Sequence, residues 1–332
     1  MLLVVVEHDR GEMSSASEEA LTCGRLLAAT LGVPLCALTI GADADELSSV
    51  VALFGVHTVY QAHHAALVDY GPDAWGSTLA QAIGALRPTV VLACGTDRGN
   101  EVMAQAAARL DLPFVANCLS FERGGAELWT VTRVRWGGSL LESATVEASV
   151  KMLTVAHHSV VVAGEPSESP GAGVVIEFVP VLGESECYSV VRTRVERGSG
   201  VTLATSRVVV GGGRGVGSAD GFAPLEALAS VLNGVVGCSR AVTNNGWRPH
   251  TDQVGQTGTR IAPDIYLACG ISGAIQHWVG AMAAKVILAI NTDREANMVT
   301  RADYAVIGDL HQVIPAITAE IERRQAIAPL NS

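Results

Sequence analysis

Short apolar runs alternate with longer amphipathic segments along the first half of the chain. Four β-branched runs predict buried strands: residues 2–6, 34–40, 56–60 and 89–93. Helices are predicted beside them: residues 17–31, 45–53, 73–86 and one that ends at residue 110. Two further runs, 128–134 and 140–146, flank Gly137-Gly138 and predict a hairpin. This half is therefore expected to be an α/β layer that mixed or antiparallel strands complete.

The second half repeats the alternation of strands and helices. Apolar runs predict strands at residues 208–210, 235–236, 265–268 and 286–290. Helices are predicted at residues 224–232, after the glycine turn through residue 285, and at 314–321. Because each strand is followed by a glycine turn or polar loop and then a helix, the pattern is typical of a doubly wound parallel sheet. The predicted fold class is α/β with two domains.

The length of 332 residues is enough for two domains, each with its own core. Residues 164–173 are rich in Pro, Gly and Ser and have a linker-like composition. A further strand pair is predicted after this segment, at residues 174–179 and 188–195. The domain boundary could thus lie in the 164–173 segment or after the strand pair, between residues 198 and 199.

Charge and composition limit the classes of partner. The chain has 22 basic and 33 acidic residues, a net charge of −11, which argues against nucleic acids and anionic membranes as partners. The sequence shows neither a signal peptide nor an apolar segment of membrane-spanning length, so we expect a cytoplasmic protein without membrane insertion. The seven cysteines form no C-x-x-C pair, so neither a zinc site nor an iron–sulfur cluster is expected.

The residues that could carry chemistry follow the strands of the second half. Glycine turns let backbone N–H groups approach a ligand, and the helix behind them favours anions. Arg214 lies among glycines and is suited to bidentate phosphate binding, while Asn291 and Asp293 follow the last of the four strands. The turn at 270–274 lacks the G-x-G-x-x-G spacing of a dinucleotide fingerprint. Since the carboxyl ends of parallel strands share one edge, these groups are expected to line one crevice.

Six short motifs occur in a characteristic order: GGRG at 212–215, GCSR at 237–240, VGQTG at 254–258, GISGAIQH at 270–277, AIN-x-D at 289–293 and ADY-x-x-x-GDL at 302–310. In this combination the chain resembles the alpha subunit of electron transfer flavoproteins, closely in its C-terminal third and more loosely before it. The resemblance implies an N-terminal adenine-nucleotide-hydrolase-like domain, residues 1–198. It also implies a C-terminal, deoxyhypusine-synthase-like FAD-binding domain, residues 199–332.

The resemblance also implies a redox role and partners. The cofactor would be FAD, bound in a heterodimer with a beta subunit. Electrons would come from dehydrogenases of the acyl-CoA dehydrogenase type, as in fatty acid β-oxidation, and pass to a membrane quinone oxidoreductase. Such a carrier has no substrate turnover of its own. Gly211 and Thr259 depart from the family pattern, which usually has Ser and Lys there.

Carried over onto this sequence, the motifs imply two groups of FAD-binding residues. The group on the pyrophosphate and adenosine side consists of Arg214, Ser272, Gly273, Ala274, Ile275, Gln276, His277, Asn291, Asp309 and Leu310. The group around the flavin ring consists of Ser239, Arg240, Gln256, Thr257 and His277. The predicted set of cofactor-binding residues is completed by Gln253, Val254, Gly255, Gly270 and Asp293. Thr257 would donate near N5, His277 would lie near O2, and Arg240 would lie over the ring, where positive charge stabilises the reduced cofactor.

Other classes of function are considered on the residues alone. No Ser-His-Asp, Cys-His or paired-carboxylate arrangement stands out. One alternative is an enzyme that binds a nicotinamide nucleotide on a deoxyhypusine-synthase-like or transhydrogenase-like sheet, with Asp293 on the ribose. Another is a nucleotide-sensing module centred on residues 94–100. The neighbouring histidines His63-His64 and His157-His158 are expected to be exposed polar groups rather than metal ligands, because adjacent residues of a strand face opposite ways.

Overall fold

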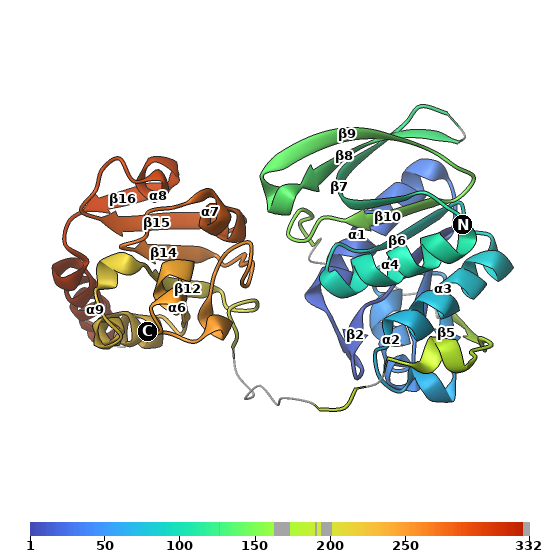
Figure 1. Ribbon diagram of the computed structural model, residues 1–332, viewed down its shortest axis with the longest axis horizontal. Coiled ribbons are helices and arrows are strands. Elements are labelled where there is room, and N and C mark those ends of the chain that lie inside the picture. Colours follow the sequence, from blue (N-terminus) through green and yellow to red (C-terminus); the bar gives the residue numbers. More distant parts are fainter. Residues whose placement is uncertain (126, 163–172, 190, 194–200, 328–332) are drawn as a thin grey trace. The chain divides into compact units, whose positions relative to one another are not determined.

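Each half of the chain carries its own sheet in the computed structural model, which describes residues 1–125, 127–162, 173–189, 191–193 and 201–327 (Figure 1). The chain divides into two units, Met1–Glu196 and Arg197–Ser332. The predicted domain boundary at 198/199 falls outside the described residues. No described helix has the length and apolar character that crossing a membrane requires.

The first unit contains a nine-stranded sheet in the order β11-β5-β4-β1-β6-β10-β7-β8-β9. Its strands are β1 Leu2–Val5, β4 Leu35–Ile40, β5 Thr58–Ala62, β6 Val90–Cys94, β7 Phe114–Arg123, β8 Leu128–Arg135, β9 Leu140–Glu147, β10 Lys151–Val155 and β11 Val174–Phe178, and a small separate ribbon pairs β2 His8–Asp9 with β3 Glu12–Met13. The helices are α1 Ser15–Leu31, α2 Leu47–Ala52, α3 Pro72–Leu86 and α4 Asp97–Leu110. The predicted α/β layer is thus confirmed.

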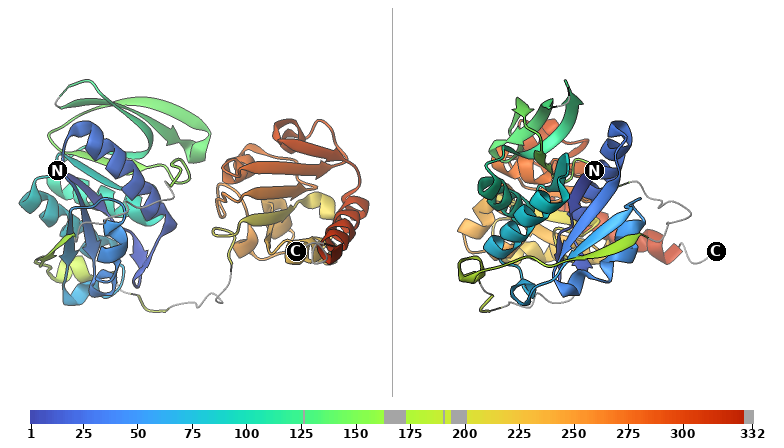
Figure 2. Two further views of the ribbon diagram at one scale, coloured as in Figure 1. Left: turned by 180° about the vertical axis from the view of Figure 1, so that it is seen from behind. Right: turned by 90° about the vertical axis from the view of Figure 1, so that its right-hand side faces the viewer.

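Helices cover both faces of this sheet (Figure 2). Alternate residues of β1 point to opposite faces, as the strand period requires, so Leu2 and Val4 pack with α1 and α2. Leu3 and Val5 pack with α3 and α4 on the other face. The two cores explain why the apolar runs in the central strands are continuous rather than alternating.

The edge formed by β7, β8 and β9 is antiparallel, as the hairpin pattern predicts. Trp136 and Gly138 in the connection have positive φ angles, and Gly138 suits that conformation. The predicted strand at 188–195 is wrong for its described residues, which form no strand. The segment has no alternating apolar face there, and its Val191 is exposed.

The orientation predicted for His157 and His158 is also wrong. Both residues follow β10 instead of lying in it, and His158 has a left-handed backbone with φ of 62°. As a result the two imidazoles stack, with ring centroids 3.5 Å apart, and both lie beside the carboxylate of Glu19. The rule that adjacent residues of a strand face opposite ways therefore does not apply to His157 and His158.

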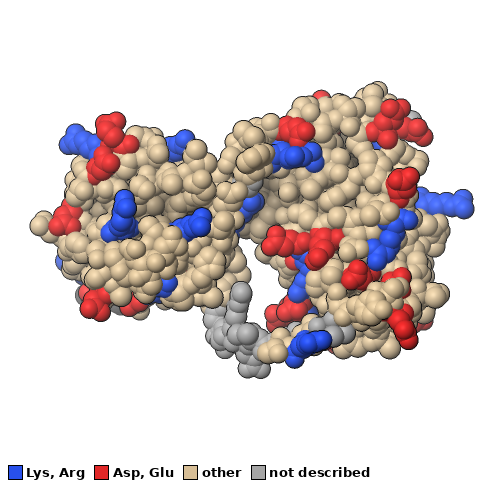
Figure 3. Space-filling view, in the orientation of Figure 1, with Lys and Arg blue, Asp and Glu red and all other residues tan. Residues whose placement is uncertain are grey.

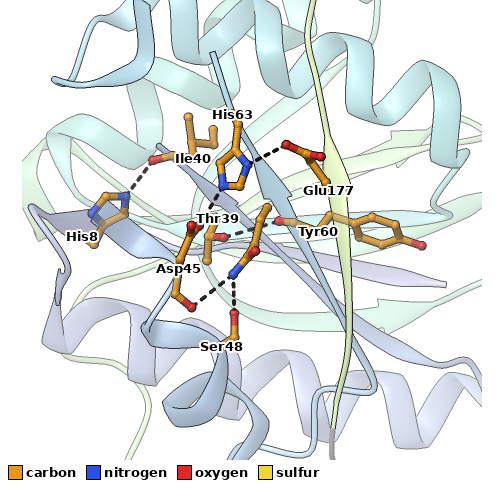
Figure 4. A network of polar contacts seen from close by, with 9 residues as sticks. His8, Thr39, Ile40, Asp45, Ser48, Tyr60, His63 and Glu177 are labelled. Carbon is orange, nitrogen blue, oxygen red and sulfur yellow. Dashed lines mark hydrogen bonds and ion pairs between the residues drawn. The ribbon is translucent and has the colours of Figure 1, made fainter. Parts of the chain in front are cut away.

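A polar network around His63 joins the edge strand β11 to its neighbour β5 (Figure 4). Its Nε2 lies 2.8 Å from Asp45 Oδ1 and its Nδ1 lies 3.0 Å from Glu177 Oε1. Hydrogen bonds to Asp45, and then to Glu177, raise the pKa of His63. Protonated His63 therefore connects β11 to the 3₁₀ turn that follows β4.

Stability of the first unit should consequently depend on pH through His63. A raised folded pKa means that the stabilisation is fully present below the unfolded value of 6.5 and is lost as pH rises through the folded pKa. Because the group is partly exposed, the gain should be at most about 1 kcal/mol. We expect His63→Asn to lower the melting temperature at pH 6 more than at pH 9. An equal change at both pH values would contradict this account.

The second unit is a five-stranded, entirely parallel sheet in the order β13-β12-β14-β15-β16. The strands are β12 Val208–Gly212, β13 Val235–Cys238, β14 Ile265–Cys269, β15 Val286–Asn291 and β16 Tyr304–Ile307. The helices are α5 Ala223–Val231, α6 Arg240–Asn244, α7 Ile275–Ala281, α8 Asn297–Arg301 and α9 Leu310–Ile327. The doubly wound parallel sheet is confirmed.

Two helix boundaries differ from the predicted ones. α7 ends at Ala281 rather than near Lys285, because the backbone N–H of Lys285 donates to Pro263 and leads the chain into β15. α9 begins at Leu310 rather than Ile314, since Asp309 accepts the N–H of His311 and caps the helix.

The order of the strands reverses beside β12. From β12 the chain crosses to β13 on one side, and it then returns to β14 on the other side and continues to β15 and β16. α5 and α9 pack on one face of the sheet, around Leu225 and Ile314, while α7 and α8 cover the other. In open α/β sheets, ligands bind where the strand order reverses, outside the carboxyl ends of the strands. The carboxyl ends of β12 and β14 therefore define the place to look for a site.

Candidate functional site

A cavity of about 310 Å³ opens at the carboxyl ends of β12, β13, β14 and β15. Its lining includes six of the predicted site residues: Arg214, Ser239, Gly270, Ser272, Asn291 and Asp293. These residues come from four different strand ends, so the sheet topology brings them together. Gly215, Ala241 and Ala296 line the cavity as well.

Glycine is required where the turns after β12 and β14 touch. A Cβ at Gly213 would lie 2.2 Å from the carbonyl oxygen of Gly270, and one at Gly215 would lie 2.8 Å from Gly270 Cα. Gly270 itself has φ of 62°, and its added Cβ would strike Leu310. The two turns are held by hydrogen bonds from Gly213 N to Cys269 O and from Gly215 N to Gly270 O. This contact fixes the backbone on both sides of Arg214.

The cavity offers unused donors for an anion. Arg214 is exposed, and it makes no ion pair with any residue that the structure describes. The backbone N–H of Ser272, which also lines the cavity, donates no hydrogen bond within the described parts of the chain, and neither do those of Gly273 and Ala274, which follow in the same turn outside the lining. A guanidinium with a row of free N–H groups is a typical arrangement for phosphate binding.

Asn291 and Asp293 shape the rim of the cavity. Asn291 Nδ2 donates to the carbonyl of Ile271 at 3.1 Å, which ties the end of β15 to the turn after β14. The Oδ1 of Asn291 accepts the N–H of Asp293, and Asp293 Oδ1 accepts the N–H of Glu295. Both side chains therefore support the loop, while Asp293 keeps one carboxylate oxygen for a further donor.

The loop at 253–259 forms a second group around buried Gln253. Its Nε2 donates to Thr257 Oγ1 at 2.9 Å, while its Oε1 lies 2.7 Å from Thr243 Oγ1 and 3.1 Å from His250 Nδ1. Since the Thr257 oxygen accepts from Gln253, its own hydroxyl hydrogen is available for a ligand. Thr257 also borders a cavity of about 640 Å³ with Gly258, Thr259 and His250.

His277 is buried at the start of α7, with its Nε2 2.8 Å from the hydroxyl of Tyr266. Burial lowers the pKa of His277 to about 4, and burial raises that of Tyr266 well above 10, so both groups are neutral near pH 7. The Nδ1 of His277 makes no hydrogen bond with the described residues. A Cβ at Gly211 would lie 2.3 Å from Tyr266 Oη, so glycine at this departure from the family pattern leaves room for the tyrosine.

The remaining predicted site residues include both buried and exposed ones. Val254 and Gly255 are buried, and Gln256 N donates to Gln276 O, which joins their loop to α7. Arg240 is exposed at the first position of α6, as are Ala274, Ile275 and Gln276 around the start of α7. Asp309 caps α9, and Leu310 is buried against Gly270.

Three functional candidates were not found from the sequence. Tyr266 orients His277, and Thr243 and His250 orient Gln253. Thr243 and His250 lie within ten residues of Gln253, but neither belongs to a motif. Tyr266 is part of an apolar strand. The one available signal of its role is that a buried tyrosine hydroxyl needs a hydrogen-bond partner.

Two family models match the chain. The electron transfer flavoprotein domain matches residues 2–180, and the electron transfer flavoprotein FAD-binding domain matches residues 202–282. "Electron transfer flavoprotein subunit alpha" of Thermoanaerobacterium thermosaccharolyticum is 34% identical over 328 residues, which cover 96% of this chain and 97% of that protein. The chain belongs to the alpha-subunit family of electron transfer flavoproteins.

Two other relatives match over nearly the whole of both chains. The electron transfer flavoprotein subunit alpha of Mycobacterium leprae is 34% identical over 97% of this chain and 98% of its own. Protein FixB of Clostridium saccharobutylicum is 34% identical over 96% of this chain and 95% of its own. Most residues that line the cavity thus lie in the matched FAD-binding domain.

The glycine turn at 94–100 in the electron transfer flavoprotein domain is filled by its own side chains. Thr96 Oγ1 bonds to Glu7 and caps α4 through the N–H of Gly99, and Arg98 donates to the His8 carbonyl. The cavity beside Cys94 and Gly99 measures only about 10 Å³. The hydroxyl, guanidinium and N–H groups of this turn thus already have partners within the protein. On the face that Figure 3 shows, basic and acidic side chains are interspersed.

Proposed function

We propose that this chain is the FAD-carrying subunit of a heterodimer with an electron transfer flavoprotein beta subunit. Electrons would enter from dehydrogenases of the acyl-CoA dehydrogenase type and leave to a membrane quinone oxidoreductase. The observation that carries the proposal is the cavity where the strand order reverses. There Arg214 and the free backbone N–H of Ser272 line one cavity inside a domain that matches the FAD-binding model, and the free N–H groups of Gly273 and Ala274 follow in the same turn.

In this proposal the two groups of residues have different tasks. Arg214 and the N–H groups of Ser272 to Ala274 hold the pyrophosphate, and Asp293 accepts from a hydroxyl of the cofactor. Thr257, oriented by Gln253, donates to the ring, and Arg240 adds positive charge beside it. FAD supplies the redox chemistry. The chain's own residues bind the cofactor, orient it and tune its potential, so no substrate turnover is expected.

Production with the beta subunit tests the cofactor and partner. We expect co-expression with the beta subunit, sought in the neighbouring reading frame, to give a yellow complex with one FAD released per alpha subunit. Expression of this chain alone should give less FAD, because the alpha subunit is proposed to need its partner. A stable complex that releases NAD instead of FAD would support the nicotinamide-nucleotide alternative and refute the proposal.

The electron route needs a separate measurement. The purified complex should be reduced by an acyl-CoA dehydrogenase with its substrate, observed as bleaching of the flavin absorbance. Omission of the dehydrogenase is the control. If the FAD-loaded complex is reduced chemically but by no acyl-CoA dehydrogenase, the proposed donor class is wrong while the cofactor assignment stands.

A further inference from the structure

The first unit brings three potential metal ligands together, well away in sequence from the FAD-binding residues. Glu19 belongs to α1, and His157 and His158 follow the end of β10. Each of the three side chains offers one ligand atom. Within the described residues, these three atoms all lie within 4.8 Å of one another. Glu19 is buried, while both histidines are only partly exposed.

The distances match those around a tetrahedral ion. His157 Nδ1 lies 3.2 Å from Glu19 Oε1, and His158 Nδ1 lies 3.7 Å from the same oxygen. Zinc bonds to imidazole nitrogen and carboxylate oxygen are about 2.0–2.2 Å, so two ligands of a tetrahedral site are separated by about 3.3–3.6 Å. The three atoms therefore need little movement to share one ion.

The His157 nitrogen is an independent sign of a missing ligand. Its Nδ1 is inaccessible to solvent and has no hydrogen-bond partner among the described residues, although Glu19 Oε1 is within reach. The ring therefore lacks the alignment that a hydrogen bond to the carboxylate requires. Metal ligands lie this close together without a hydrogen bond between them, because their lone pairs point at the ion and not at one another.

The backbone holds the group in place. The left-handed conformation of His158, φ 62°, turns the second imidazole back toward Glu19 at a conformational cost that few non-glycine residues bear. The N–H groups of His158 and Ser159 donate to the two oxygens of Glu19 at 3.1 and 3.2 Å. Burial raises the pKa of Glu19, but the neighbouring imidazoles and the His158 N–H outweigh it and keep the carboxylate charged. Such supporting hydrogen bonds are typical of metal-binding carboxylates.

We propose that Glu19, His157 and His158 bind a divalent transition-metal ion of the zinc class. The ion would join the segment after β10 to α1. It would give the buried His157 nitrogen a coordinate bond and would leave the FAD crevice of the second unit unchanged.

Metal titration of the full chain, produced without a polyhistidine tag and freed of metal with EDTA, tests the proposal. Zn²⁺ is added in competition with a chromogenic chelator, and Co²⁺ is added separately because its visible absorption reports tetrahedral geometry. We expect one ion per chain in each titration and a tetrahedral cobalt spectrum. Weak binding at several sites, or an octahedral cobalt spectrum, would refute the proposal.

Substitutions of the proposed ligands test which residues bind the ion. His157→Ala and Glu19→Gln should each weaken Zn²⁺ binding by at least about tenfold to a hundredfold, since even supporting residues have effects of that size. The amide of the Glu19→Gln variant keeps one of the two oxygens that accept backbone N–H groups, and folding of each variant is checked by circular dichroism. His57→Ala is the control, because His57 is exposed and outside the cluster. Equal affinity in wild type and the His157 and Glu19 variants would overturn the assignment.

Discussion

Replacing Arg214 by alanine should weaken FAD binding by roughly tenfold to a hundredfold. A charge-assisted hydrogen bond contributes about 1.5–3 kcal/mol, and each 1.4 kcal/mol corresponds to about tenfold in affinity. Arg214 lines the cavity and makes no ion pair with the described residues, so its guanidinium is free to bind phosphate. The glycine contacts on both sides hold its backbone in place before the ligand arrives, which reduces the ordering cost of binding.

Titration of the FAD-free complex with FAD measures the effect. Arg214→Lys should recover only part of the affinity, because lysine restores the charge without the planar pair of donors. Arg324→Ala is a matched control, since Arg324 is exposed on α9 and pairs with Glu320. If Arg214→Ala binds FAD as tightly as the Arg324 variant, Arg214 is merely an exposed arginine.

The sequence predicts the crevice well because its residues follow strands. Arg214, Ser239, Ser272 and Asn291 lie far apart along the chain, yet each comes at or just after the end of an apolar run. Parallel strands place their carboxyl ends at one edge, so topology alone brings these side chains to one cavity. The glycines between them mark the close contact of the two turns.

Contacts that depend on side-chain direction could not be predicted in the same way. The hydrogen bond between Tyr266 and His277 joins β14 to α7, and nothing in the spacing of eleven residues specifies it. His157 and His158 are on one side because the chain leaves β10 before them and takes a left-handed turn. Neighbouring side chains point to opposite sides only within a strand. Because β10 ends two residues before His157, His157 and His158 can instead lie on the same side.

Gln253→Glu should shift the reduction potential of the bound FAD in the same direction as Thr257→Val. In the structure Gln253 Nε2 donates to Thr257 Oγ1, which leaves the threonine hydrogen for the cofactor. A carboxylate of the same shape only accepts, so it would take the threonine hydrogen for itself. One hydrogen bond contributes about 0.5–1.5 kcal/mol, which is roughly 20–60 mV for one electron.

A double-mutant comparison separates orientation of the hydroxyl from general damage. Potentials of wild type, Gln253→Glu, Thr257→Val and the double variant are measured by spectroelectrochemistry, above the pH at which the buried carboxyl ionises. The added charge of Gln253→Glu also shifts the potential directly, and the double variant keeps this part without the hydroxyl, so the two single shifts should sum to more than the shift of the double variant. Gln253→Leu should destabilise the fold by about 1–3 kcal/mol, since it leaves the partners of a buried amide unsatisfied. Additive shifts in the double variant would show that Gln253 affects the potential independently of Thr257.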